Sequence, residues 1–140
     1  MNADDSDSVQ FIGATVLQDF GKQAGSQSPN EYLIIDGQQR LTTIYLLICG
    51  LAWCYKNSNR KDDALTLIET YLASNVGKYK GMPKLLPTIQ DRTQFFNILI
   101  NDLELIDWNV SHEEKDTESK KTNITDQWER IKKYFQHYKV

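Results

Sequence analysis

The sequence predicts an α+β fold, in which a small β-sheet packs with a central buried helix and further helices. Three observations indicate this class. Two short apolar segments, residues 9–17 and 31–36, lie near the N-terminus and are rich in residues typical of strands. A run without any charge, residues 41–55, follows them and is too long for a typical strand. Later segments carry apolar residues at spacings of three and four, which indicates helices with one buried face.

The size and charge of the chain limit its function. The 140 residues fit one domain, and 40% of them are hydrophobic, which is enough to form a core. The formal net charge is −3, because 19 acidic residues outnumber 16 lysines and arginines. A domain that grips a phosphate backbone by itself is normally basic. We therefore expect this chain alone to bind DNA only weakly.

Residues 1–8 are acidic and polar, so we expect them to be disordered, and they contain no secretory signal. The uncharged run 41–55 is shorter than the roughly 20 residues that cross a bilayer, so we expect no membrane segment. Cys49 and Cys54 lie on different faces of the predicted helix and form no CxxC motif. These features predict two buried thiols in a reducing, cytoplasmic environment.

The first half of the chain predicts two strands and the central helix. Gly13 in the first strand, residues 9–17, indicates a bulge or a close backbone approach. Residues 19–30 are rich in Gly, Ser, Pro and Asn and predict a loop. The second strand, 31–36, has a continuously apolar centre, so we expect it to be covered on both faces. The helix over 41–55 is apolar almost all round, which predicts a buried position at the centre of the fold.

The second half predicts three further helices, over residues 60–75, from Asp91 onward and from residue 124 to the chain end. Two prolines oppose helix and predict a short extended piece over 84–89. Residues 111–121 are charged and polar without an apolar member, which predicts a loop. The expected buried faces are Leu65, Ile68 and Leu72 in the first of these helices, Phe95, Phe96, Leu99 and Leu103 in the next, and Ile124, Trp128, Ile131, Phe135 and Tyr138 in the last.

A polar turn, Asp36-Gly37-Gln38-Gln39-Arg40, separates the second strand from the apolar helix. A glycine-containing turn between a strand and a helix has the geometry of an anion site, because the first N–H groups of a helix lack intrahelical partners and lie at the positive end of its dipole. Gly37 lets a ligand approach the backbone, and Arg40 offers a planar fork of donors to phosphate oxygens. Gln38 and Gln39 can donate hydrogen bonds to a phosphate, a ribose or a base.

Asp36 can hold a metal-bound water or polarise an attacking water, and Thr42 adds a hydroxyl in the first helical turn. A structural role is the alternative, because Asp36 before a helix is a good N-cap with which Arg40 can pair. The spacing matches neither a P-loop nor a dinucleotide motif. Asp91 and Arg92 can likewise reach the site or cap their own helix. From the residues alone, both interpretations stay open.

Residues 35–47, IDGQQRLTTIYLL, resemble the signature of the N-terminal-domain family of GmrSD-type modification-dependent restriction endonucleases. Other segments agree in order. Residues 11–17 are similar to the family's strand FLGSIVL, residues 84–95 to its LxPTxxDRxxF segment, and residues 128–138 to its AYxYF helix. The resemblance covers roughly residues 9–140. It implies a partial domain with a fold similar to ParB and sulfiredoxin.

The resemblance also implies a function, since the DGQQR motif of that family is associated with nucleotide binding and hydrolysis. It implies catalytic roles for Asp36 and Arg40, a magnesium ligand in Asp36, and a site for a nucleoside triphosphate with Mg²⁺. The cofactor-binding residues expected here are Gly37, Gln38, Gln39, Arg40 and Thr42. Members of the family mostly serve in phage defence, where they sense modified DNA and control a nuclease. The implied partners are therefore a nucleotide, modified DNA and an HNH-type nuclease domain or subunit.

Two departures from the family pattern shape these expectations. The family's YQRxYxW segment, which precedes its FLG strand, has no counterpart here, so we expect a domain truncated at its N-terminus. No nuclease signature is present, and His112 and His137 are predicted to be separate surface residues. Alternative functions are a non-catalytic ParB-like module that binds DNA or protein, and an inactive truncated remnant.

Overall fold

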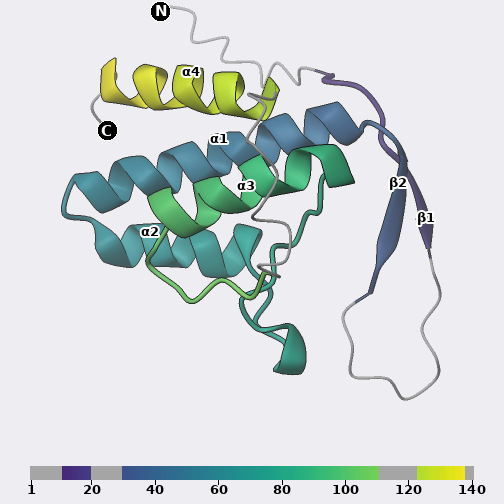
Figure 1. Ribbon diagram of the computed structural model, residues 1–140, viewed down its shortest axis with the longest axis horizontal. Coiled ribbons are helices and arrows are strands. Elements are labelled where there is room, and N and C mark those ends of the chain that lie inside the picture. Colours follow the sequence, from purple (N-terminus) through teal and green to yellow (C-terminus); the bar gives the residue numbers. More distant parts are fainter. Residues whose placement is uncertain (1–10, 20–29, 111–122, 138–140) are drawn as a thin grey trace, which may run out of the picture.

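The computed structural model describes residues 11–19, 30–110 and 123–137. Within these residues a two-stranded sheet stands beside a group of packed helices (Figure 1). The predicted α+β class is therefore confirmed. The disorder expected at residues 1–8 and the charged loop expected at 111–121 lie outside the described residues.

The sheet is an antiparallel hairpin of β1 (Val16–Asp19) and β2 (Tyr32–Asp36). The second predicted strand is confirmed to within one residue. The first is displaced, because residues 11–15 have no regular structure and β1 starts only at Val16. The register also shifts between Val16 and Leu17, so the pairing with β2 is irregular near Asp36.

The expectation that β2 is covered on both faces is wrong. Ile35 is 57% and Leu33, on the same face, 45% exposed, and on the other face Tyr32 is 49% exposed and Ile34 is only half-buried. Among the described residues β2 pairs with β1 alone, and the hairpin stands to one side of the helices (Figure 1). A continuously apolar strand is typical of a sheet that other elements cover on both faces. The composition of the strand alone does not determine whether such elements pack against it.

Helix α1 (Gln38–Asn57) is the central helix of the fold and packs against α2 (Lys61–Leu67) and α4 (Asn123–His137). Its central position was predicted. Its start was not, because the last three residues of the polar turn form the first helical turn. The expectation of burial all round is wrong for one face, on which Ile44 is 36% and Leu47 43% exposed.

The close packing of α4 on α1 depends on Gly50. A Cβ at this position would overlap Ile131 and the ring of Phe135 on α4. Glycine in a helix interior costs about 0.5–1 kcal/mol relative to alanine. Here it lets the two helices approach where a larger residue would separate them.

The second predicted helix changes its winding along its length. After α2 it continues as a π-helical turn, Ile68–Leu72, which ends with the Ala73 N–H donating to the Ile68 carbonyl at 2.8 Å. Carbonyl groups at a helix end need partners from elsewhere. Tyr45 Oη supplies one by donating to the Leu72 carbonyl at 2.7 Å.

Helix α3 (Ile89–Asp102) follows a 3₁₀ turn (Gly77–Tyr79) and residues 84–88, which form neither helix nor strand. The extended piece predicted over 84–89 is therefore at least one residue too long, because Ile89 already belongs to α3. Helices α1, α3 and α4 all begin at the end of the fold that lies nearest the hairpin (Figure 1). The polar first turns of these helices are therefore brought together.

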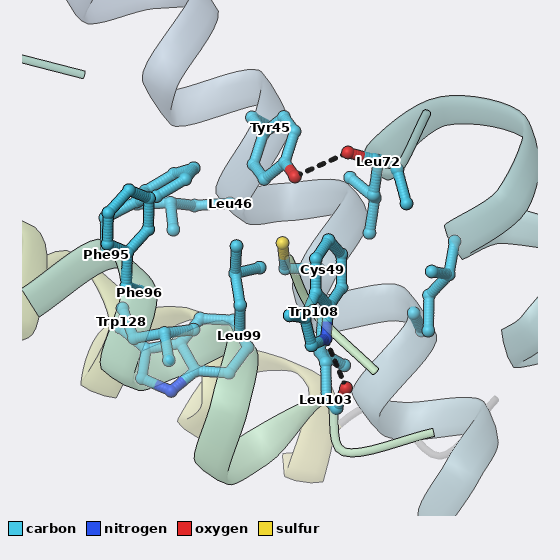
Figure 2. Close-up of a cluster of buried hydrophobic side chains, with 14 of the residues drawn as sticks. Tyr45, Leu46, Cys49, Leu72, Phe95, Phe96, Leu99, Leu103, Trp108 and Trp128 are labelled. Carbon is cyan, nitrogen blue, oxygen red and sulfur yellow. Dashed lines mark hydrogen bonds between the residues drawn. The ribbon is translucent and has the colours of Figure 1, made fainter. Parts of the chain in front are cut away.

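The core lies between α1, the π-helical turn, α3 and α4, as Figure 2 shows for its labelled side chains. Both tryptophans in it satisfy their indole N–H groups: Trp108 donates to the Leu103 carbonyl at 2.7 Å and Trp128 to Asp102 Oδ2 at 2.6 Å. Cys49 and Cys54 are buried free thiols, as predicted. None of the helices in the described residues is both long and apolar enough to span a bilayer. The largest fully buried side chains are those of Phe95, Leu46, Ile68, Leu72, Leu99, Leu103 and Cys49.

Candidate functional site

Helix α1 begins directly after Gly37, whose φ of 90° is a backbone conformation that favours glycine. Space also requires glycine here, because a Cβ at Gly37 would lie 2.8 Å from Thr15 Oγ1. Since Gly37 is the N-cap residue, no side-chain hydrogen bond caps the helix. The first N–H groups of α1 are thus left without the usual side-chain acceptor.

Asp36 does not cap α1, so the structure does not support that part of the structural alternative. Its Oδ1 instead accepts a hydrogen bond from the Gly37 N–H at 2.8 Å, one residue before the helix starts. The other carboxylate oxygen lies 3.9 Å from Arg40 Nη2, and the Asp36 side chain is 69% exposed. An exposed ion pair of this length is worth about 0–1 kcal/mol.

The Arg40 guanidinium lies over Gly13, in the segment that leads into β1. Its Nη1 donates to the Ile12 carbonyl at 3.2 Å, which uses one of five N–H donors. A Cβ on Gly13 would overlap the guanidinium, and the φ of Gly13 is 107°. The prediction of a bulge or a close backbone approach at Gly13 is therefore corrected, because a side chain approaches it and Gly13 precedes β1. Because the Arg40 side chain is 40% exposed, its charge faces both the protein and solvent.

A cleft of about 160 Å³ lies where α1, α3 and α4 begin. Amide and hydroxyl side chains dominate its lining, together with one carboxylate and two apolar residues. The lining residues are Gln38, Gln39, Thr42, Pro87, Thr88, Asp91, Asn123, Ile124 and Gln127.

The structure divides the predicted site residues between the cleft and the hairpin. Gln38, Gln39 and Thr42 line the cleft. Asp36 and Arg40 lie at the hairpin, where Arg40 contacts residues 12 and 13. Gly37 joins the two groups. The Thr42 hydroxyl donates its hydrogen bond to the Gln38 carbonyl at 2.9 Å. Toward a ligand it can therefore act only as a hydrogen-bond acceptor.

Asp91 lies in the first turn of α3 and lines the cleft, and no side-chain hydrogen bond caps this helix. Thr88, the N-cap residue of α3, donates from its hydroxyl to Asp91 Oδ2 at 3.1 Å, and both residues line the cleft. Arg92 turns away to its own helix start, where its Nε donates to the Pro87 carbonyl at 3.1 Å. Asp91 therefore both stabilises the first turn of α3 and contributes a carboxylate to the cleft.

Asn123 and Gln127 line the cleft from α4 and were not predicted as site residues. The sequence of this helix predicts only which apolar residues are buried. It does not predict whether a polar residue beside them faces solvent or a cleft. Their position is set by packing, and a hydrogen bond from Thr125 Oγ1 to Gln94 Oε1 at 3.1 Å ties the start of α4 to α3. Only the fold could place them in the cleft.

Metal-binding capacity at the site is limited. The residues that the structure describes contain no group of three or more His, Cys, Asp and Glu side chains able to hold a metal ion. Asp36 thus belongs to no cluster of three or more such side chains within the described residues, which suits an ion that brings most of its own ligands. His137 is exposed near the end of α4, in agreement with the prediction, and His112 lies outside the described residues.

Comparison with protein families agrees with the resemblance in the polar turn. Residues 4–140 match the family model described as GmrSD restriction endonuclease, N-terminal domain. The match spans nearly the whole chain, so the chain belongs to this family and is a domain of a restriction system. No curated protein and no solved structure matched the chain.

Proposed function

We propose that this domain binds and hydrolyses a nucleoside triphosphate and acts as the sensor of a modification-dependent DNA restriction system in the cytoplasm. In that role it controls a nuclease carried by another domain or chain. One observation carries the proposal: the half-exposed Arg40 guanidinium lies beside the first turn of α1, whose N-cap is a glycine without a capping side chain. Membership of the restriction endonuclease family supports the setting.

The phosphates would bind at the start of α1, where uncapped backbone N–H groups and a guanidinium offer donors to the same anion. Gly37 keeps the backbone open to the ligand because it carries no Cβ. Gly13 leaves the space that the Arg40 guanidinium occupies, and the Ile12 carbonyl accepts a hydrogen bond from its Nη1 at 3.2 Å. This arrangement holds the arginine in place before the nucleotide arrives.

Asp36 fits a magnesium ion that arrives with the nucleotide, since Mg²⁺ uses one or two protein carboxylates together with phosphate oxygens and water. Its carboxylate is 69% exposed at the strand end, next to the proposed phosphate position. The ion, when bound, would neutralise phosphate charge. Asp36 also lies where it can orient and polarise a water molecule for attack on a phosphate.

The charge of the chain and its family suggest which other macromolecules take part in the system. Its net charge of −3 opposes direct, non-specific binding of DNA, so the sensing of modified DNA would use other parts of the system. Family membership suggests an HNH-type nuclease domain or subunit as the effector. Nucleotide binding and hydrolysis by this domain would then set the state of that nuclease.

Unfolding by denaturant with and without nucleotide and Mg²⁺ tests the proposal. A ligand at a hundredfold excess over its dissociation constant raises the free energy of unfolding by about 2.7 kcal/mol. Release of inorganic phosphate from the same mixture tests hydrolysis. Absence of stabilisation at millimolar concentrations of all four nucleoside triphosphates would contradict nucleotide binding.

DNA binding separates the proposal from the alternative of a ParB-like DNA-binding module. We expect weak binding of unmodified duplex, without steep dependence on salt, because the net charge is −3. Submicromolar binding at physiological salt that weakens sharply as salt is added would favour the alternative.

A further inference from the structure

The side chains that line the cleft beside the polar turn differ from those of a typical phosphate site, although three helices begin around it. Its described lining holds four side-chain amides, two hydroxyls and the Asp91 carboxylate, and none of the nine lining residues carries a positive charge. A triphosphate placed inside would meet a carboxylate and no cation. Amides and hydroxyls both donate and accept hydrogen bonds, which suits an uncharged heterocycle with a mixed donor and acceptor edge.

The size of the cleft leads to the same conclusion. Its volume is about 160 Å³. Pockets for whole drug-sized ligands measure about 300–1,000 Å³. The cleft therefore has room for one ring system and not for a complete nucleoside triphosphate.

The geometry of α1 separates the cleft from Arg40. Residues follow one another at about 100° around a helix, so Arg40 lies about 160° from Gln38 and Thr42 and about 100° from Gln39, the three α1 residues that line the cleft. A ligand that contacts both sides must cross the N-terminus of α1 at Gly37. A nucleotide has this shape, since its base and its phosphates lie at opposite ends of the ribose.

We propose that the cleft binds the base of the nucleotide, with Gln127 and Asn123 of α4 as specificity-determining residues, while the phosphates stay outside it on the Arg40 side of α1. This inference rests on the proposed nucleotide binding and adds two residues that lie outside the DGQQR motif. Bonds from Thr125 to Gln94 and from Thr88 to Asp91, each 3.1 Å long, hold the cleft walls in position.

Titration calorimetry of the full chain with Mg²⁺ tests the inference, using ATP, GTP, CTP, UTP and inorganic tripolyphosphate as separate probes. The inference predicts that at least one nucleotide binds about tenfold more tightly than tripolyphosphate, because one or two neutral hydrogen bonds are worth about that factor. Gln127→Ala should weaken this nucleotide about five- to tenfold and leave tripolyphosphate unchanged. Asn123→Ala provides a second variant with the same expected pattern.

Gln136→Ala is the matched control, since it removes an exposed glutamine from the same helix. It should bind every probe as the wild type does. Equal affinity for nucleotides and tripolyphosphate, with nucleotide affinity unchanged in Gln127→Ala and Asn123→Ala, would overturn the base site. Phosphate binding at Arg40 would then still stand. Binding of neither nucleotide nor tripolyphosphate would overturn the proposed function together with the inference.

Discussion

The Arg40 guanidinium occupies the space over Gly13 in which any other residue would place its Cβ. Arg40 belongs to the first turn of α1, and Gly13 belongs to the segment before β1. The hydrogen bond from Arg40 Nη1 to the Ile12 carbonyl, 3.2 Å long, fixes this contact. Two motifs separated in the sequence thus form one local structure, and the position of the arginine depends on the absence of a side chain at residue 13.

Gly13→Ala should displace Arg40 and abolish stabilisation by nucleotide. The new methyl group overlaps the guanidinium, and the φ of 107° is strained for alanine. Gly77→Ala is the control, because Gly77 also has a positive φ, 49°, but has open space where its Cβ would lie. Thermal melts of both variants with and without nucleotide and Mg²⁺ provide the measurement. A nucleotide response of Gly13→Ala equal to that of Gly77→Ala would contradict the account.

Gly50→Ala should destabilise the fold by about 1–3 kcal/mol, although alanine is the better helix former by about 1 kcal/mol. Its Cβ would overlap Ile131 and Phe135 and push α4 away from α1. Urea denaturation measures the loss. Adding Phe135→Ala removes the ring from this overlap and leaves only Ile131, so the double variant should be more stable than the sum of the two single losses predicts. A simple sum, or a stabilised Gly50→Ala, would show that α4 does not pack closely at this position.

Ile35→Thr and Ile68→Thr compare the same substitution at an exposed and a buried site. Ile35 is 57% exposed in β2, so its replacement should change stability by no more than about 0.5 kcal/mol. Ile68 is fully buried, and its replacement should cost about 2–5 kcal/mol. Denaturant unfolding of both variants gives the two values. Similar, large losses at both sites would mean that the hairpin is covered in solution.

Stability should fall as the pH rises above about 9. Burial raises the pKa of the Cys49 thiol far above its ordinary value of 9.0, and burial together with the nearby Cys49 raises the pKa of Tyr45 well above 10.0. Above these ordinary values the unfolded chain releases protons that the folded chain keeps, so unfolding becomes easier by about 1.4 kcal/mol per pH unit and group. Below pH 8 both groups are protonated in both states and contribute no slope.

Cys49→Ala isolates the thiol contribution. Urea unfolding between pH 8 and pH 10 should show a smaller fall in stability for this variant than for the wild type, because one of the two buried groups no longer titrates. The absolute stability of the variant is lower at every pH owing to the lost side chain, so the slope is the quantity to compare. Identical slopes would contradict the burial of an un-ionised thiol at this position.

The sequence predicted those parts of the fold that depend on local pattern. The apolar stripe of α4 and the helical spacing around Phe95 follow directly from burial of one helix face, and both are confirmed. The exposure of Ile35 and Leu47 could not be predicted, because an apolar residue indicates a preference for burial and not the presence of a neighbour. That neighbour is a property of the whole arrangement.

The candidate site shows the same limit. The polar turn indicated its own residues, and the glycine at position 13 indicated a close approach. That Arg40 would be the approaching group depends on how the hairpin folds back beside α1. Gln127 gives no signal in the sequence, since its role depends on α4 beginning next to α1 and α3.

The central claim is that the start of α1 binds the phosphates of a nucleotide through Arg40. Free energies of unfolding of the wild type, Arg40→Ala and Asp36→Ala, each with and without nucleotide and Mg²⁺, test it most directly. Arg130→Ala, which removes an exposed arginine of α4, serves as the control. Because the pair of Arg40 with Asp36 is exposed and 3.9 Å long, Arg40→Ala should change the stability of the unliganded domain by less than about 1 kcal/mol.

The account predicts that Arg40→Ala abolishes stabilisation by nucleotide, that Asp36→Ala retains more of the binding seen without metal, and that Arg130→Ala responds as the wild type does. Equal losses of about 0.5–2 kcal/mol in Arg40→Ala and Asp36→Ala, with an unchanged response to nucleotide in both, would contradict it and leave the pair with a structural role alone.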